Sequence, residues 1–559
     1  SLTGLTTSSH MLSVAGNNIA NVNTTAYKRS RISFQTQISQ TLANGSAPSQ
    51  TSGGTNPIQI GMGAQLAAVR RDFSSGPLQL TGVSTDVALE GPGFFIVNTG
   101  GTAYYTRAGS FSLDRDFHLV TPSGAKLQGY GVDENFNINA TTLGDVTIPL
   151  GALRIAEATG TVQFSGNLNA GGDVATQGSI LTTQTLYADA TATTTADATT
   201  NLNSIYDAAG NLLFQTGDVI TLSGAAKGGA ALPDRTFEVG PANTTGSDAN
   251  GTTMQDLMDF LQAVLGIDTT ISGGLSMAAG VLTIEGNGGT ANDLDISDAD
   301  FVVNSGGVTS SPLTFSKDQA ADGESVRTIF AAFDSLGNPM NVELTVVLES
   351  KGNSGTTWRY YAQSGDDSDP ARHLGTGVLS FDTQGQLTAI SDDSITIDRD
   401  GTGAISPQTI TLSFANDLGS VTALADQQSQ IAAISQDGSP LGTLQDFNIT
   451  EDGTIQGIFS NGLLRDLGRI PVAVFVNNEG LEEVGGSLFR PSANSGEATV
   501  VTATTGGSGR LIGRALELSN VDLADEFINL INASTGFSAS SRVLTSSDRL
   551  LQELIATIR

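Results

Sequence analysis

The sequence predicts a mainly β, multidomain chain with α-helical coiled-coil termini, in which discontinuous domains are nested and the N- and C-terminal helices pair. Three observations predict this fold class. Apolar residues recur every seven positions at both ends of the chain, and the middle consists of short apolar or alternating runs between Gly, Pro, Asn and Asp turns. The length of 559 residues allows about four domains at roughly 150 residues each.

The N-terminal repeat places Leu5, Leu12 and Ile19 seven residues apart, and small or apolar residues follow each of them by three positions. These partner positions are Ser8, Ala15 and Val22. Two apolar positions per heptad are typical of a short coiled-coil seam.

The C-terminal repeat is longer, and its members are Leu523, Leu530, Phe537, Leu544, Leu551 and Ile558. The partner position holds Ala533, Ser540, Ser547 and Leu554. Ser519 and Asp522 resemble a capping box, so we expect a helix from about residue 521 to 557. From spacing alone, two amphipathic helices packing on a globular core remain an equal alternative.

The composition of the second helix favours a helix that depends on neighbours. Gly536 and the Ser-rich run 538–541 lower helix propensity, and Gly costs about 1 kcal/mol relative to Ala. We therefore expect this helix to form fully only when other helices cover its seam.

Between the helices, β-hairpin material is expected throughout. Residues 87–89, the turn Gly91-Pro92-Gly93 and residues 94–97 predict one hairpin with a type II turn. Similar material occurs at 111–120, 342–348, 378–387 and 470–476. One internal helix is predicted over Thr253–Leu265, and a linker over Ala43–Thr55.

Composition excludes several classes of function. The chain has 25 Lys plus Arg against 56 Asp plus Glu, a net charge of −31, which argues against nucleic-acid binding. It has no Cys, which excludes disulfides and thiolate metal sites and suits an extracellular protein. No apolar run approaches the roughly 18 residues of a membrane span, and residues 1–25 lack the basic leader of a signal peptide.

Several segments resemble the family of bacterial flagellar rod, hook and hook-associated proteins. Residues 15–24, followed by Ala26-Tyr27-Lys28, are similar to its N-terminal motif, and residues 86–97 with 105–111 are similar to the rod and hook branch. Residues 334–338 and 452–462 resemble hook proteins in particular, and residues 516–527 resemble the opening of their C-terminal helix.

The resemblance implies a structural subunit that polymerises into a hollow, curved, flexible tube, the universal joint between rod and filament. It implies no enzymatic activity, no cofactor and no metal. The implied partners are further copies of the chain, the distal rod protein, the hook-associated junction protein, the hook cap and the type III export apparatus, and the implied location is the extracellular flagellum.

The resemblance also implies a domain order. Residues 1–32 and 520–559 form the helical domain that lines the channel, 33–71 a linker region, and 72–163 with 436–519 the inner β domain. Residues 164–180 with 313–435 form the outer β domain, and 181–312 the inserted outermost part.

The resemblance assigns roles in polymerisation and in the inner β domain to two groups of residues. The polymerisation helices use the heptad residues above with Phe527 and the asparagines Asn17, Asn18 and Asn21. The inner β domain motif comprises Gly93, Phe94, Phe95, Tyr105, Arg107 and Phe111. The asparagine cluster has two open interpretations, a helix end or amide bonds between neighbouring subunits.

Three alternatives are weighed against a hook subunit. A distal rod protein shares most motifs but lacks large inserted domains. A secreted β-rich adhesin leaves the paired heptads unexplained. A glycosidase needs two carboxylates flanking a pocket, and the three His residues are scattered. The acidic groups at 293–300 and 398–401 do not follow the calcium-loop pattern, so we interpret them as solvated turns.

Overall fold

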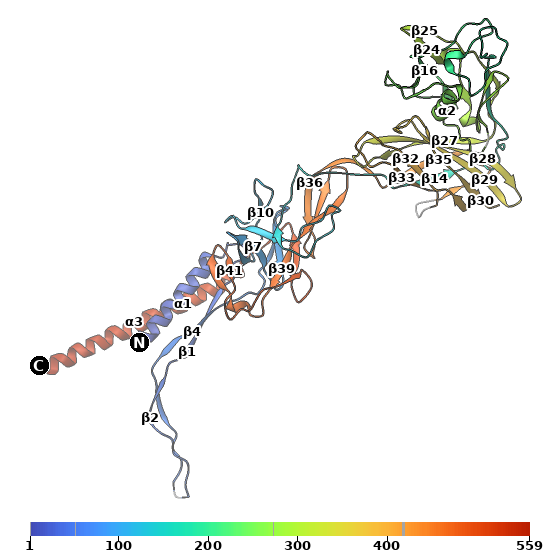
Figure 1. Cartoon of the computed structure of the whole chain (residues 1–559). Helices are drawn as coiled ribbons and strands as arrows, with labels where there is room; N and C mark the ends of the chain where they lie inside the picture. Colours follow the sequence, from blue (N-terminus) through green and yellow to red (C-terminus); the bar gives the residue numbers. More distant parts are fainter. Residues whose placement is uncertain (1, 51, 272, 416–419, 559) are drawn as a thin grey trace. The chain divides into compact units, whose positions relative to one another are not determined.

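The computed structural model describes residues 2–50, 52–271, 273–415 and 420–558. The chain forms two compact units, unit 1 with Ser1–Arg154 and Thr443–Arg559, and unit 2 with Ile155–Gly442. The described part contains three α-helices and is otherwise built of strands (Figure 1), so the predicted mainly β class is confirmed.

Unit 1 carries both terminal helices, α1 (Leu2–Ala20) and α3 (Leu523–Ile558), which pack side by side (Figure 1). The start of α3 differs from the expected capping box. The Asp522 carboxylate accepts the Ala524 N–H at 2.8 Å and the Asp525 N–H at 3.4 Å, so Asp522, and not Ser519, caps the helix.

The predicted linker over 33–71 is wrong, because this segment is a long β-hairpin that extends away from the rest of unit 1 (Figure 1). Its strands are β1 (Ser30–Thr36) with β4 (Ala64–Arg71), and β2 (Ser39–Ala43) with β3 (Ile58–Gly61). Bridges continue the ladder toward the tip, from Ser46 to Thr55 and from Ser49 to Ser52. The Gly- and Ser-rich residues that predicted a linker occupy only the tip of the hairpin, and the strands on either side of the tip pair with each other.

The inner β domain of unit 1 contains an eight-stranded sheet and several strand pairs. The sheet has the order β40 (Glu482–Gly485), β41 (Leu488–Arg490), β8 (Thr102–Thr106), β7 (Phe95–Thr99), β11 (Lys126–Gly129), β10 (Leu119–Val120) and β9 (Ser112–Leu113), and β12 (Gly144–Asp145) pairs with β11. The other pairings are β36 (Ser439–Ile449) with β37 (Thr454–Phe459) and β38 (Leu464–Arg469), β39 (Pro471–Val474) with β42 (Thr499–Thr502), β6 (Val87–Glu90) with β43 (Arg510–Gly513), and β5 (Leu78–Leu80) with β44 (Ala515–Glu517).

The predicted hairpin around Gly91-Pro92-Gly93 is wrong. Strand β6 pairs with β43, whereas β7 pairs with β8 and β11, so the turn connects two different sheets. A Cβ atom on Gly93 would lie 2.1 Å from Cγ1 of Val472, and one on Gly91 would lie 2.8 Å from Cα of Gly509. Both glycines, at φ of +129° and +106°, let the turn lie close to neighbouring strands.

The outer β domain of unit 2 is a sandwich of two five-stranded sheets. One sheet contains β32 (Ser394–Ile397), β33 (Gln408–Ser413), β14 (Thr161–Asn167), β34 (Val421–Thr422) and β35 (Gln430–Gln436). The other contains β27 (Ser325–Phe333), β28 (Pro339–Gly352), β29 (Gly355–Ser364), β30 (His373–Phe381) and β31 (Leu387–Ser391). Phe164 from the first sheet and Phe330 and Trp358 from the second share one buried core.

The inserted domain has its own core around α2 (Met254–Leu265). The predicted internal helix is confirmed, with Thr253 as N-cap and Asp256 completing the capping box. One of its sheets contains β21 (Gly274–Ala278), β22 (Val281–Gly288), β15 (Gly178–Thr183) and β26 (Phe315–Gln319). A second contains β20 (Ala249–Gly251), β19 (Arg235–Val239), β16 (Val219–Leu222), β24 (Phe301–Ser305) and β25 (Val308–Ser310). A third contains β18 (Ala230–Ala231), β17 (Ala226–Lys227) and β23 (Leu294–Asp295).

The observed domain limits differ slightly from the expected ones. The inserted domain runs from β15 to β26, residues 178–319, and the outer domain begins with β14 at residue 161. Strand β13 (Arg154–Glu157) and β36 contain the two unit boundaries. Short 3₁₀ helices lie at Leu202–Ser204, Thr290–Asn292, Asp298–Asp300 and Asn478–Gly480.

Candidate assembly surface

Helices α1 and α3 run antiparallel in close contact through small residues. A Cβ atom on Gly4 would lie 3.0 Å from Oγ of Ser540, and one on Gly536 would lie 3.0 Å from Oγ of Ser8. Farther along, the amide Nδ2 of Asn18 donates to Oε1 of Glu526 at 3.0 Å. As the residue number increases along α1, the number of its contact residue on α3 decreases, so the two helices are antiparallel.

The face that joins the two helices is the stripe of small residues. Ala15 and Ala533 are 2% and 1% exposed, whereas Leu12 remains 39% exposed. Within one chain, small residues and not the large heptad residues form the contact between the two helices. A seven-residue repeat marks two stripes on a helix and does not by itself say which one a given neighbour covers.

The large heptad residues therefore lie outside the α1–α3 contact. Leu5, Ile19 and Leu530 are half-buried. Those that stay 39% to 57% exposed are Leu12, Leu523, Phe527, Phe537, Leu544 and Leu551. The side chain of Ile558 lies outside the described residues.

Beyond the α1 contact, α3 continues with an apolar surface. The exposed residues there are Val543, Leu544, Leu550, Leu551, Leu554 and Ile555, at 44% to 65% exposure. An apolar stripe of this extent on a helix marks an interaction site.

Asn18 ties α1 to its surroundings within one chain. Its Nδ2 donates to the Ser30 carbonyl at 2.9 Å as well as to Glu526, and its Oδ1 accepts the Ser30 N–H and the Tyr27 hydroxyl. Asn17 donates to the Tyr27 hydroxyl, and Asn21 donates back to Asn17. Asn18 thus fixes the helix end, while Asn21 lies in the partly buried turn that follows α1.

A buried ionic network, which we call the ion hub, holds the segment after the end of α1 and the segment before the start of α3 to the inner β domain. Glu517 accepts from Nζ of Lys28 at 2.7 Å, from Nε of Arg107 at 3.1 Å and from the Gly76 N–H at 2.8 Å. All three charged side chains are 0% to 2% exposed. Arg107 also donates to the carbonyls of residues 89, 91 and 93.

Burial sets the electrostatics of the ion hub. It lowers the pKa of Lys28, and the nearby Arg107 lowers it further, while Glu517 acts in the opposite direction. Arg107 was predicted as a member of the inner β motif, whereas no role was predicted for Lys28 and Glu517. They are 489 positions apart, and no local spacing connects them.

The remaining residues of the inner β motif form its core. Phe94 packs edge-on against Phe73, Phe475 and Phe489 at ring centroid distances of 5.5 to 5.9 Å, and Tyr105 contacts Phe475. Phe95 packs on Phe111 at 5.5 Å. Such edge-to-face contacts between buried aromatic rings stabilise the domain that carries the ion hub.

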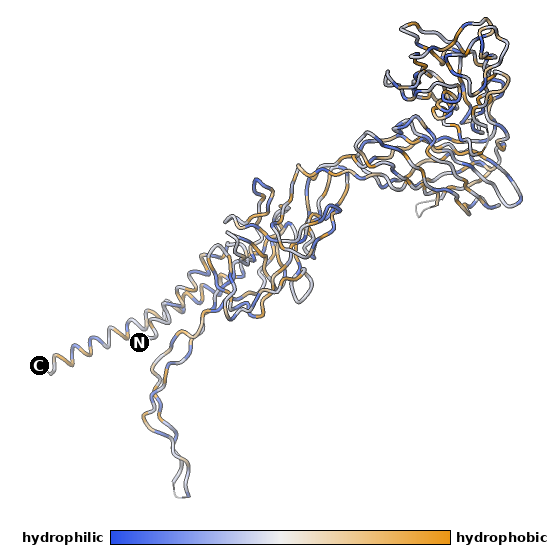
Figure 2. The backbone as a smooth tube through the Cα atoms, in the orientation of Figure 1, coloured by the Kyte–Doolittle hydropathy of each residue, from blue (hydrophilic) through white to orange (hydrophobic). Residues whose placement is uncertain are grey.

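The hairpin of residues 30–71 presents a second apolar surface, visible as hydrophobic positions along its length in Figure 2. The exposed members are Phe34, Ile38, Leu42, Ile58, Ile60, Met62, Leu66 and Val69, at 38% to 80% exposure. A two-stranded hairpin is marginally stable in water by itself, so burial of this surface would stabilise the hairpin. At its base lies a groove of about 920 Å³ that includes Arg31, Arg70 and Val476.

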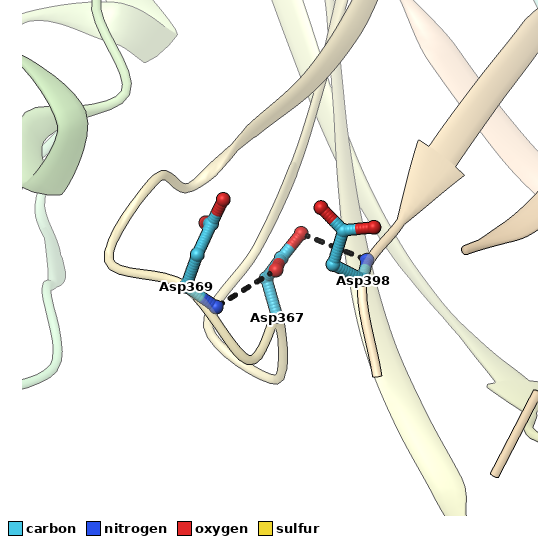
Figure 3. A group of neighbouring side chains, drawn as sticks. All are labelled: Asp367, Asp369 and Asp398. Carbon is cyan, nitrogen blue, oxygen red and sulfur yellow. Dashed lines mark hydrogen bonds between the residues drawn. The ribbon is translucent and has the colours of Figure 1, made fainter. Parts of the chain in front are cut away.

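Among the residues of unit 2 that the structure describes, Asp367, Asp369 and Asp398 form one compact group of carboxylates (Figure 3). Asp367 accepts the backbone N–H groups of Asp369 at 3.1 Å and of Asp398 at 3.3 Å. Burial, with the two neighbouring carboxylates, raises the pKa of Asp367 to about 6. The acids at 293–300 serve local structure, since Asp293 pairs with Lys317 and Asp300 caps a short helix.

None of the helices in the described part of the chain has the length and hydropathy needed to cross a membrane.

Four family models match the chain in sequence order and together span about half of it. They are the flagella basal body rod protein at residues 1–28, the flagellar hook protein FlgE/F/G D1 domain at 88–164, the flagellar basal body protein FlaE D2 domain at 302–439, and the flagellar basal body rod FlgEFG protein C-terminal model at 513–557.

Curated relatives match over nearly the full length. The flagellar hook protein FlgE of Treponema pallidum is 27% identical, and the match covers 98% of this chain and 96% of that protein. The hook protein FlgE of Borreliella burgdorferi is 28% identical, with 99% and 97% covered. That of Escherichia coli K12 is 27% identical, with 99% and 98% covered.

The solved structures that match include the following two. The crystal structure of Helicobacter pylori FlgE2 covers 78% of this chain and 100% of that chain, at 17% identity and a TM-score of 0.40. The 32 kDa fragment of Caulobacter crescentus FlgE covers 50% and 99%, at 13% identity and a TM-score of 0.22. Because the family models occur in order and hook proteins match from end to end, the chain belongs to the family of bacterial flagellar hook proteins.

Proposed function

We propose that this structural subunit of the flagellar hook polymerises through α1 and α3 into a hollow, curved, flexible tube that transmits torque from rod to filament as a universal joint. The observation that carries the proposal is the apolar stripe on α3, where Phe527, Leu544 and Leu551 are 44% to 57% exposed in a single chain. Burying such side chains contributes about 1.5–3 kcal/mol each.

In the polymer, the terminal helices of neighbouring copies line the channel as a coiled coil. The small-residue stripe is already used between α1 and α3 of one chain, so the large heptad residues are free to pack against other copies. The apolar face of the hairpin, residues 30–71, packs between copies next to the helices for the same reason.

The remaining partners follow from the position of a hook in the flagellum. They are the distal rod protein at one end, the hook-associated junction protein at the other, the hook cap during growth and the type III export apparatus. The extracellular location accords with the absence of Cys. We expect no enzymatic activity.

Electron microscopy of the purified chain under polymerising salt tests the proposal. The test variant carries Leu544→Asn and Leu551→Asn, and the matched control carries Thr545→Asn and Gln552→Asn at exposed positions of the same helix. We expect curved hollow tubes from the wild type and the control, and at least a tenfold higher critical concentration for the test variant, which corresponds to about 1.4 kcal/mol.

Other outcomes distinguish the alternatives. Tubes from the Leu variant at the wild-type concentration contradict the role of α3. Straight tubes from the wild type favour a distal rod protein. A chain lacking residues 1–32 and 520–559 is expected to remain monomeric, and tubes from it overturn the assignment of both helices.

A further inference from the structure

The inserted domain docks on the outer β domain through a polar contact, which we call the domain seam. The C-terminal end of α2 lies against the ends of β29 and β30. The Arg372 N–H donates to the Ala263 carbonyl at 3.0 Å, and Nε2 of Gln363 donates to the Gly266 carbonyl at 2.8 Å. The last carbonyls of α2 thus receive donors from the other domain.

Lys227 lies at the centre of the domain seam and is 2% exposed. Its Nζ lies 3.4 Å from the Leu265 carbonyl and 3.3 Å from the Gly266 carbonyl, at the negative end of the α2 dipole. Across the seam, Nη1 of Arg327 donates to the Lys227 carbonyl at 2.9 Å. Arg327 of the opposite domain thus binds the backbone of Lys227 and brings a second positive charge near the lysine.

The other charged groups of the domain seam come from every element around it. Oε1 of Glu343 lies 3.5 Å from Nη1 of Arg327, and its Oε2 lies 3.7 Å from Nη2 of Arg372. His373 lies 4.0 Å from Asp268. Three further groups lie around these residues at the domain seam. They are the Arg235–Asp248 pair, the Arg359–Glu349 pair and the phenol of Tyr361.

Several buried polar atoms at the domain seam have no hydrogen-bond partner. They are Oδ2 of Asp268, Nδ1 of His373, and Nε and Nη1 of Arg372. Unpaired buried polar atoms weaken an interface by about 1–3 kcal/mol each. The contact between the two domains is therefore weak, and an added positive charge would weaken it further.

The charges of the domain seam balance only when Lys227 and His373 are neutral. Three arginines, at positions 235, 327 and 372, then face Asp248, Asp268 and Glu343, and the Arg359–Glu349 pair balances itself. Protonation of both bases adds one fully buried positive charge at Lys227 and one partly exposed positive charge at His373.

Burial favours the neutral forms of both bases. It lowers the pKa of Lys227 to about 7, with Arg372 and Arg327 acting in the same direction and Glu343 opposing them. It also lowers the pKa of His373, where Lys227 acts in the same direction and Asp268 opposes. Since undocking restores ordinary pKa values, docking loses free energy as pH falls through the range between the ordinary and the lowered values.

The chain connects the two domains only at one side of the inserted domain, which leaves the seam free to open as a hinge. The connections are residues 173–178 and 319–325, held together where Asp322 accepts the N–H groups of Thr176 and Gln177.

We propose that the domain seam is an acid-released latch, in which the inserted domain swings away from the outer β domain when Lys227 and His373 take up protons. This goes beyond the role of the chain in the hook, and it concerns the single subunit.

Energy transfer between two dyes on the full-length chain tests the latch. Because the chain has no Cys, the substitutions Thr309→Cys in the inserted domain and Gln384→Cys in the outer β domain, both at exposed positions, give specific labelling. Trp358 is the single tryptophan and is fully buried in the outer β domain, so its fluorescence reports unfolding separately.

We expect the transfer efficiency to change reversibly as the pH falls from about 10 to about 5, the range that runs from just below the ordinary pKa of Lys227 to below that of His373, while the Trp358 emission stays constant. The variant Lys227→Met with His373→Gln is expected to shift the midpoint by at least about one pH unit toward acid. The control Lys317→Met, at a partly exposed cation of the inserted domain, is expected to match the wild type.

Three results overturn the latch. One is a transfer efficiency that stays constant over this pH range in the wild type. Another is a change that coincides with a Trp358 emission change, which indicates unfolding. The third is an unchanged midpoint in the double variant. The wild-type titration decides the question even when the double variant fails to fold.

Discussion

At the scale of single residues, buried charge connects distant parts of the chain. The ion hub joins Lys28 after α1, Arg107 in the inner β domain and Glu517 before α3, and its main acceptors and donors are satisfied. Breaking a buried pair costs far more than the pair itself contributes, because a charge is left without compensation.

We therefore expect Glu517→Gln to lower the stability of unit 1 by about 3–5 kcal/mol. Urea unfolding followed by circular dichroism at 222 nm measures this, since α1 and α3 contain most of the helix. The exposed Glu479, 3.7 Å from Arg70, provides the control, and Glu479→Gln is expected to change stability by less than about 0.5 kcal/mol. Equal effects of the two variants contradict the role of the ion hub.

A second residue-scale prediction concerns Asp367, whose pKa in the folded chain is raised to about 6. The folded state then holds a proton that the unfolded state has lost between about pH 4 and 6, so stability falls as pH rises through this window. Asp367→Asn is expected to raise the urea midpoint of Trp358 fluorescence at pH 7.5, with no gain near pH 4. The exposed Asp393→Asn serves as control, and a gain that is the same at both pH values refutes the prediction.

At the scale of elements, local signals predicted well and distant pairings did not. The α2 helix was predictable because its cap, Thr253, and its apolar face lie within thirteen residues. The hairpin of residues 30–71 was missed because each strand is stabilised by its partner across a Gly- and Ser-rich tip. The heptad spacing marked the apolar stripes of α1 and α3, but it did not predict which stripe joins the two helices of one chain, because spacing alone does not identify the covering neighbour.

The helix contact gives an element-scale prediction. Ala533 is 1% exposed against α1, so Ala533→Leu forces the helices apart and is expected to cost about 1–3 kcal/mol. Hydrogen exchange of the α1 amides measures the loss. Ala539→Leu, at an exposed position of α3, is expected to leave exchange unchanged. Similar protection in both variants contradicts the proposed register.

At the scale of the whole molecule, charge is concentrated in unit 2. This unit holds 8 basic and 34 acidic residues, so its net charge is 8 − 34 = −26 of the total −31. The eight cations all bond within the unit. Neighbouring copies of unit 2 therefore repel each other, and salt screens that repulsion over about 8–10 Å.

We expect the critical concentration for polymerisation to fall as NaCl rises from about 20 to 200 mM, because the Debye length shortens about threefold. Light scattering measures it. A variant with Asp295, Asp393 and Asp400, all exposed, changed to Asn is expected to show a smaller salt dependence. An unchanged salt dependence in this variant assigns the effect to another part of the molecule.

The antiparallel contact of α1 with α3 also sets an order in time. Asn18 and Glu526 are 508 positions apart, so their bond closes a loop that contains nearly every domain of the chain. Contacts at such separation form late in folding, since the intervening chain must first be ordered or searched. The helix pair can therefore form only after α3 has been made, so a nascent chain that still lacks α3 has no complete helix pair to contribute to a polymer.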